Sequence, residues 1–118
     1  MPVESGPDVW PGYSRAYTQG SCLMPKGYWI AHVTVTDPEQ YKLYAGATPE
    51  AFRKYGATIL ARAGTAHQME GDGRPRNVVI EFPSLQAALD CYNSPEYQAA
   101  KAKRAGAGIA EIVLVEGV

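Results

Sequence analysis

The chain has 118 residues, 46% of them hydrophobic and 19% charged, which is typical of a single globular domain with a modest core. Its 11 lysines and arginines nearly balance its 12 aspartates and glutamates, so it lacks the excess positive charge that attracts nucleic acid or an anionic membrane surface. We therefore expect no nucleic-acid partner and no membrane partner.

The first 26 residues are rich in glycine, proline and serine, a composition typical of a flexible leader. They also contain Trp10, Tyr13 and Tyr17, aromatic side chains that gain stability when they are buried. We therefore expect residues 1–26 to form an ordered arm, packed against the domain or a partner subunit, and residues 27–118 to form one domain. Closure of a ligand site by this arm is the alternative.

The domain begins with a predicted strand and a predicted helix. The segment YWIAHVTV (28–35) alternates in polarity and is rich in β-branched and aromatic residues, which predicts a strand. Asp37 then supplies an N-cap, and Pro38 suits the first helical turn. Thr48 and Pro49 repeat the same cap-and-proline pattern, so we expect the helix to be interrupted there.

The second half contains three predicted strands and a helical region. The segments ATILARA (57–63) and NVVIEF (77–82) predict two strands joined by a glycine-bearing turn. Residues 83–106 predict a helical region that a serine and a proline at 94–95 cap again in its middle. The segment AEIVLVEG (110–117) predicts the last strand.

The order strand, helix, strand, strand, helix, strand predicts the fold class. Two right-handed crossovers of this kind combine into an α+β, ferredoxin-like domain, with a four-stranded antiparallel sheet and the helices on one face. The repeated triplets TPE (48–50) and SPE (94–96) predict one bend in each half of the helical layer. Tyr28 and Ile30 make the second face of the sheet apolar as well, so we expect a homodimer to cover it and form a dimeric α/β barrel.

Three segments carry a resemblance to a known family. The segments YWIAHVTVTDPEQY, VVIEFPS and YNSPEYQAAK resemble, in order and spacing, the bacterial family called domain of unknown function 1330, over roughly residues 27–117. The resemblance implies a ferredoxin-like subunit of the dimeric α/β-barrel kind, and no catalytic residue. Cys91 and Gly73 stand where such sequences usually carry large aromatic residues, so a pocket lined by those positions would be wider in this chain.

Strand alternation places a candidate site on one face of the sheet. Tyr28 and His32 share a face of the first strand, Arg62 lies on a face of the second, and Asn77 and Glu81 share one on the third. In the ferredoxin-like order, Glu81 is expected between His32 and Arg62, inside the dimer interface. Such a cluster is either a structural ion network or part of a ligand cavity.

The ligand-cavity hypothesis assigns a role to each residue of this cluster. His32 is the candidate general acid or base, oriented by Glu81, and Arg62 receives an anionic or enolate oxygen. Tyr28 and Asn77 on the same face, and Tyr92 beside the second proline corner, are further candidates for substrate binding.

Other reactive residue types give weaker signals. Cys91 has no base next to it in the sequence and is expected to be a small core residue. His67 is expected to be a solvated residue beside a turn. The two cysteines, Cys22 and Cys91, fit neither a disulfide framework nor a zinc motif, and the N-terminus has no secretory pattern, so we expect a cytoplasmic location.

Three functions are consistent with these patterns. The first is a cofactor-independent enzyme of the isomerase, cyclase or monooxygenase kind that acts on a small organic substrate. The second is a non-catalytic homodimer that binds or senses a small organic ligand. The third is a haem-binding protein, for which His32 is a poor axial ligand. Since motifs for metals and nucleotides are absent from the sequence, we expect no cofactor.

Overall fold

The computed structural model describes residues 25–118, so the predicted N-terminal arm lies almost entirely outside the described residues. Four strands and three helices follow one another as β1 (Gly27–Val35), α2 (Pro38–Lys54), β2 (Thr58–Arg62), β3 (Arg76–Phe82), α3 (Leu85–Tyr92), α4 (Pro95–Lys103) and β4 (Gly108–Glu116). None of the helices in this part of the chain has the length and hydrophobicity needed to cross a membrane.

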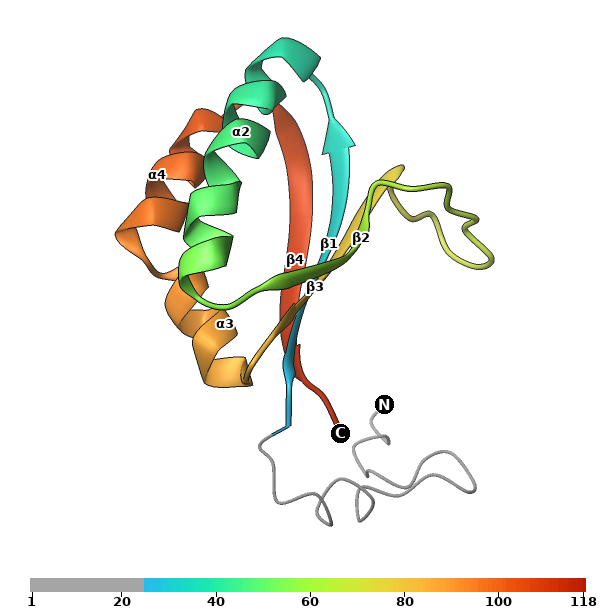
Figure 1. Cartoon of the computed structure of the whole chain (residues 1–118). Helices are drawn as coiled ribbons and strands as arrows, with labels where there is room; N and C mark the ends of the chain where they lie inside the picture. The colour runs from blue at the N-terminus through green and yellow to red at the C-terminus, as the bar shows by residue number, and fades with distance from the viewer. Residues whose placement is uncertain (1–24) are drawn as a thin grey trace.

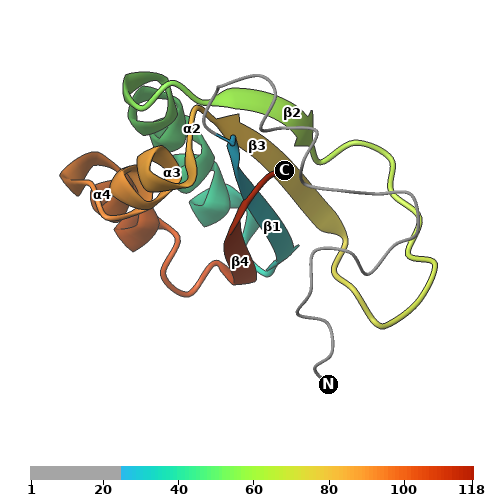
Figure 2. The same cartoon turned by 90° about the horizontal axis from the view of Figure 1, so that it is seen from below.

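The sheet has the topology that the sequence predicts. Its four strands lie in the order β2-β3-β1-β4, and every neighbouring pair is antiparallel. All three helices cover one face of the sheet, and none of the described elements covers the other, which we call the open face (Figures 1 and 2). The domain is therefore α+β and ferredoxin-like, as predicted.

The strand alternation also matches the prediction for the central strand. Trp29, Ala31 and Val33 point toward the helices and are buried in the core. Tyr28 and Ile30, between them in the sequence, lie on the open face and are half-buried. The period of two residues thus separates a core face from a face that no helix covers.

The predicted interruption of the first helix at Thr48 is wrong. Helix α2 continues through Pro49 to Lys54 as a single element. A proline in a helix interior cannot donate to the carbonyl four residues earlier, here that of Ala45. The hydroxyl of Thr48 donates to this same carbonyl at 3.2 Å, so the acceptor that Pro49 leaves free is satisfied and the helix does not end.

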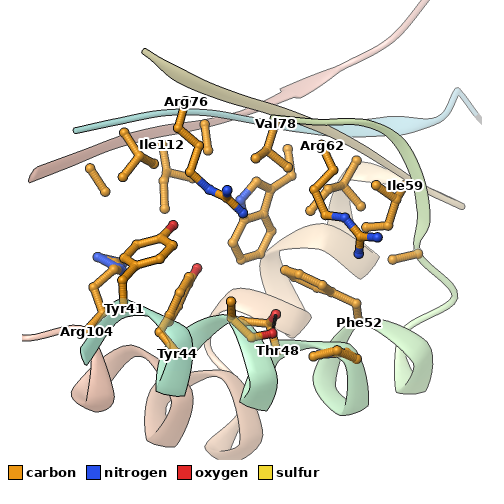
Figure 3. Close-up of a pocket in the computed structure, with 18 of the residues that line it drawn as sticks. Tyr41, Tyr44, Thr48, Phe52, Ile59, Arg62, Arg76, Val78, Arg104 and Ile112 are labelled. Carbon is orange, nitrogen blue, oxygen red and sulfur yellow. Dashed lines mark hydrogen bonds between the residues drawn. The ribbon is translucent and has the colours of Figure 1, made fainter. Parts of the chain in front are cut away.

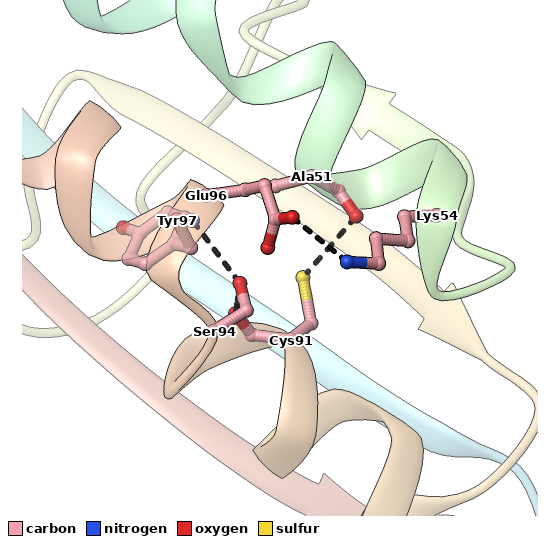
Figure 4. A network of polar contacts seen from close by, with 6 residues as sticks. All are labelled: Ala51, Lys54, Cys91, Ser94, Glu96 and Tyr97. Carbon is pink, nitrogen blue, oxygen red and sulfur yellow. Dashed lines mark hydrogen bonds and ion pairs between the residues drawn. The ribbon is translucent and has the colours of Figure 1, made fainter.

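The second predicted corner, at Ser94 and Pro95, is confirmed. Ser94 is the N-cap of α4: its hydroxyl oxygen accepts a hydrogen bond from the Tyr97 backbone N–H at 3.1 Å and donates to the Cys91 carbonyl at 2.7 Å (Figure 4). Beside this corner, Lys54 Nζ lies 2.8 Å from a carboxylate oxygen of Glu96. The hydrogen bond from Lys54 lowers the pKa of the Glu96 carboxyl group, and it ties the end of α2 to the start of α4.

Candidate functional site

A cavity of about 460 Å³ lies between helix α2 and the helix-facing side of the sheet (Figure 3). This volume falls within the range of about 300–1,000 Å³ that is usual for small-molecule sites. Most of its wall is apolar and comes from the core face of the strands, including Trp29, Val78 and Ile112. The polar residues in its wall are Tyr41, Tyr44, Thr48, Arg53, Arg62, Arg76 and Arg104.

Arginines from three different elements point into this cavity. Arg76 opens β3 and pairs with Val33 in the register, which places it on the helix-facing side. Arg62 ends β2, and Arg104 is the C-cap of α4. In Figure 3, Arg76 extends toward Tyr41, and Arg62 lies on the side of Phe52 and Ile59.

Aromatic rings of α2 hold two of these guanidinium groups. The guanidinium carbon of Arg76 lies 5.3 Å from the centre of the Tyr41 ring, and that of Arg104 lies 4.8 Å from the centre of the Tyr44 ring. Arg104 also donates a hydrogen bond to the Tyr97 hydroxyl at 3.4 Å. These contacts position both cations at the same wall of the cavity.

The cavity carries positive charge without a matching acid. No aspartate or glutamate of the described chain lines it, and the ion pairs of these residues join other groups. The Nε atoms of Arg76 and Arg104 are buried and have no hydrogen-bond partner among residues 25–118. A buried N–H donor of a cation without a partner is unfavourable, so this wall is chemically suited to an anion.

Tyr44, which lines the cavity, is joined to the fully buried Tyr97 behind it. The Tyr44 and Tyr97 hydroxyl oxygens are 2.8 Å apart and hydrogen-bonded. Burial, reinforced by the neighbouring Tyr97, raises the pKa of the Tyr44 phenol far above its ordinary value, and burial also raises the pKa of Tyr97. Both groups therefore stay protonated near neutral pH, and they act as hydrogen-bond donors rather than as bases.

The candidate residues on the central strands lie on the open face and form two separate pairs. The Tyr28 hydroxyl donates to a carboxylate oxygen of Glu81 at 3.1 Å. His32 Nδ1 lies 2.6 Å from Asn77 Oδ1. The register explains the pairing, because Tyr28 lies opposite Glu81 and His32 lies opposite Asn77. The structure therefore does not bring Glu81 against His32.

The predicted position of Arg62 is wrong. A bulge in β2 shifts the pairing with β3 between Ile59 and Ala61, so that Ala61 lies opposite Val79 and Arg62 opposite Val78. One extra residue in a strand moves every later side chain to the other face. Arg62 therefore lines the helix-side cavity, on the opposite side of the sheet from His32 and Glu81.

Tyr92 lies beside a second hollow rather than in the main cavity. This hollow, about 400 Å³ in volume, lies along β4 and is lined by Tyr92, Lys101, Arg104, Ala110, Ile112 and Leu114. Lys101 Nζ lies 5.4 Å from the centre of the Tyr92 ring. Arg104 lines both hollows, so its side chain lies where they adjoin.

Gly73 and Cys91, the two positions at which this chain departs from the family pattern, line neither of these two cavities. Gly73 lies in the exposed loop between β2 and β3, which also contains His67 and fits its interpretation as a solvated residue. Cys91 is fully buried in the core, and its thiol lies 3.7 Å from the Ala51 carbonyl oxygen (Figure 4). The condition for a wider pocket, that these positions line it, is therefore not met in either of the two cavities.

The burial of Cys91 leads to a testable prediction about its reactivity. Burial raises the pKa of this thiol to about 12, so at pH 8 roughly one molecule in 10,000 carries the reactive thiolate. We expect iodoacetamide at pH 8 to leave Cys91 unmodified in the native protein and to alkylate it in urea, as measured by peptide mass spectrometry. Rapid alkylation of the native protein would contradict a core role.

Two of the cavity arginines have no role in the sequence-based site. Arg76 shares the alternation of Val78 and Ile80, so strand parity alone assigns it to the helix-facing side. Arg104 reads from the sequence as a solvated cation at the end of a helix. Its place in the cavity follows from the packing of α4 against α2, which no local pattern predicts.

Comparison with known proteins identifies the family. The sequence profile of the family described as a domain of unknown function, DUF1330, matches residues 26–118. The chain belongs to this family. None of the curated proteins matches the sequence.

The residues that the structure describes contain no cluster of histidine, cysteine, aspartate and glutamate side chains suited to a metal ion.

Several solved structures share the fold at low sequence identity. A protein of unknown function from Rhodopseudomonas palustris, RPA0582, has a TM-score of 0.66 at 14% identity, with 90% of this chain and 94% of that chain covered. SnoaB, a cofactor-independent oxygenase from Streptomyces nogalater, has a TM-score of 0.54 at 13% identity, with 77% and 91% covered. A conserved protein of unknown function from Bacteroides thetaiotaomicron has a TM-score of 0.54 at 7% identity, with 78% and 97% covered. At these identities the similarity shows the fold alone.

Proposed function

We propose that this protein binds a small organic molecule in the cavity between α2 and the sheet, and that it acts on this molecule as a cofactor-independent enzyme of the oxygenase kind. The observation that carries the proposal is the cavity itself: about 460 Å³, with a largely apolar wall that includes aromatic side chains, and with four arginines in its lining. A mostly apolar hollow with a few convergent polar groups is the usual form of a small-molecule site.

The side chains around the cavity favour a substrate that ionises easily. Its titratable wall residues are arginines and tyrosines, and Tyr44 is held protonated by its burial. The cavity wall thus offers donors and positive charge but no general base. Arg62 keeps its proposed role, which is to receive an anionic or enolate oxygen and so favour loss of a proton from the bound substrate. The fold shared with SnoaB, itself a cofactor-independent oxygenase, is consistent with this chemistry by analogy.

We further propose a homodimer formed through the open face of the sheet. Ile109, Val113 and Val115 of β4 lie on this face with about half of their surface exposed, at 51%, 53% and 44%. The Tyr28–Glu81 and His32–Asn77 pairs lie on the same face, so the proposed dimer buries them. Buried polar groups that are already hydrogen-bonded favour a structural role for His32 and Glu81 over a catalytic role.

Non-catalytic ligand binding is the second candidate function. The absence of a base among the described residues of the cavity wall favours it, because binding needs only the apolar wall and the arginines. Haem binding has less support, since His32 lies on the other side of the sheet and its Nδ1 is already hydrogen-bonded to Asn77.

A cavity-filling substitution tests the site. Val78 is half-buried at the centre of the cavity wall, so Val78→Phe should place a ring inside the cavity without breaking the sheet. We expect saturation-transfer NMR to detect binding of aromatic acids, phenols or amides by the native protein, and this variant to bind them at least tenfold more weakly. Oxygen uptake in the presence of each bound compound separates turnover from binding alone.

Leu89→Phe is the matched control for this experiment. Leu89 lies on α3 outside the cavity lining and is 37% exposed, so the added ring should leave binding unchanged. If Val78→Phe bound the same compounds as strongly as the native protein, the cavity would not be the binding site.

A further inference from the structure

We propose that the ligand of this cavity is an aromatic carboxylate, with its carboxylate group held by Arg76 and Arg104 and its ring against Trp29 and Phe52. This inference rests on the proposed function and adds the chemical class of the ligand. Four observations carry it: the unneutralised charge, the free N–H donors, the way the guanidinium groups are held, and the aromatic wall.

The charge in the cavity calls for an anion. Arg62, Arg76 and Arg104 all line the cavity, and none of them has an ion-pair partner among the described residues. Arg74, which lies two residues before Arg76, is paired with Glu111 at 3.2 Å. Glu111 is thus committed elsewhere, so a bound anion would relieve a repulsion among cations that the described part of the chain leaves uncompensated.

The free donors point to a planar, bidentate anion. The Nε atoms of Arg76 and Arg104 are buried without partners. In arginine, Nε–H and one neighbouring Nη–H form a fork with the spacing of the two oxygens of a carboxylate. One Nη of Arg104 donates a hydrogen bond to the Tyr97 hydroxyl at 3.4 Å, and its Nε–H remains available to a ligand.

The contacts that hold the two guanidinium groups leave their hydrogen-bonding capacity free. Arg76 and Arg104 lie over the rings of Tyr41 and Tyr44. A cation–π contact stabilises the charge of a guanidinium, but it satisfies none of its N–H donors. Both cations are therefore positioned before a ligand binds and still able to donate, which reduces the entropy cost of binding.

The remaining wall of the cavity suits an aromatic ring. Trp29 and Phe52 both line it, and their ring centres are 5.2 Å apart at an interplanar angle of 85°. Figure 3 shows Phe52 facing the interior from α2, while Arg76 enters from the sheet above. Trp29 is 1% exposed, so the half-buried ring of Phe52 offers the main contact for a planar ligand, and Trp29 closes the corner behind it.

A pair of matched probes tests this assignment. 2-Naphthoate and 2-naphthamide have nearly the same size and shape, and only the first carries a charge at neutral pH. Isothermal titration calorimetry with the full chain at low salt should give at least tenfold tighter binding of the naphthoate, since hydrogen bonds to charged groups are the strong class.

Variants that remove one arginine charge test whether Arg76 and Arg104 cause the preference for the naphthoate. In Arg76→Gln and Arg104→Gln, the naphthoate should bind about 10- to 100-fold more weakly, while the affinity for the amide should change less than threefold. Lys42→Gln is the matched control, because Lys42 is an exposed cation on the outer surface of α2 and should leave both affinities unchanged. The rise in unfolding temperature caused by the naphthoate should be lost in the two arginine variants and kept in the control.

Different results would contradict the cavity as the binding site and the carboxylate as the ligand group. If 2-naphthamide bound the native protein as tightly as 2-naphthoate, and Val78→Phe weakened both, the cavity would stand as the site and the carboxylate assignment would be wrong. If neither probe bound the native protein, or if Val78→Phe left their binding unchanged, the cavity would not take aromatic ligands and both proposals would be overturned.

Discussion

Replacement of Trp29 by alanine is expected to lower the free energy of unfolding by about 3–5 kcal/mol, the usual cost of deleting a large buried aromatic side chain. Trp29 is 1% exposed at the centre of the core face. Its ring centre lies 5.2 Å from that of Phe52, 5.9 Å from that of Phe82 and 4.9 Å from that of Tyr97. Deletion removes these ring contacts and a fourth, to Tyr92 at 5.7 Å, and it enlarges the cavity that Trp29 lines.

Urea denaturation followed by far-UV circular dichroism measures this change. Trp29→Phe is the control, because it keeps an aromatic ring at the same place and should cost clearly less than the alanine variant. Equal losses in the two variants would mean that the indole ring makes no specific contribution to the aromatic cluster.

The same residue shows how much of the fold the sequence predicts. Trp29, Ala31 and Val33 alternate with a set that contains His32 and Thr34, and this period of two identifies the more apolar face of β1 without reference to any other strand. The order of the elements then leaves few topologies, since both crossovers are right-handed. The four-stranded sheet with helices on one face follows from these two rules, and the structure agrees.

The site was harder to predict because it depends on local irregularities. Alternation places Arg62 with Leu60 and Thr58, and one bulged residue in β2 moves it to the other side of the sheet. No residue in TILAR marks this bulge, since it contains no glycine or proline. The predicted cluster of His32, Glu81 and Arg62 assumed that side chains alternate strictly along β2. The bulge breaks this alternation.

The two proline triplets differ for a reason that lies outside their own sequence. TPE and SPE predict the same corner, yet only Ser94 breaks the helical layer. Both hydroxyls donate to the carbonyl three residues earlier, that of Ala45 for Thr48 and that of Cys91 for Ser94. Ser94 also accepts from the Tyr97 N–H and so caps a new helix. Both side chains are buried, so the cap hydrogen bond to Tyr97 is what distinguishes Ser94, and the motif does not encode it.

The open face of the sheet supports the second prediction with a large effect. Val113 lies at the middle of β4, pairs with Ile30 of β1 and is 53% exposed. Ile109 and Val115 extend this apolar strip along the same strand. An apolar face of this kind on a sheet that is covered on one side only is typical of an interface between subunits.

Val113→Lys is expected to convert the proposed homodimer into a monomer. The substitution places an ammonium group in the middle of the apolar strip, and its symmetric copy would face it across a two-fold interface. Burying two unpaired like charges would cost several kcal/mol, enough to raise the dissociation constant at least a thousandfold. Sedimentation velocity at micromolar concentration should show the native protein at twice the mass of the chain and the variant at the mass of one chain.

Leu43→Lys separates this effect from a general loss of surface hydrophobicity. Leu43 is 59% exposed on α2, a helix on the other side of the sheet, so its replacement should leave the dimer intact. A native protein that sediments as a monomer would refute the interface directly. A dimer that survives Val113→Lys but dissociates in Leu43→Lys would move the interface to the helical layer, and the open face with its Tyr28–Glu81 and His32–Asn77 pairs would then be free to contact solvent or another partner.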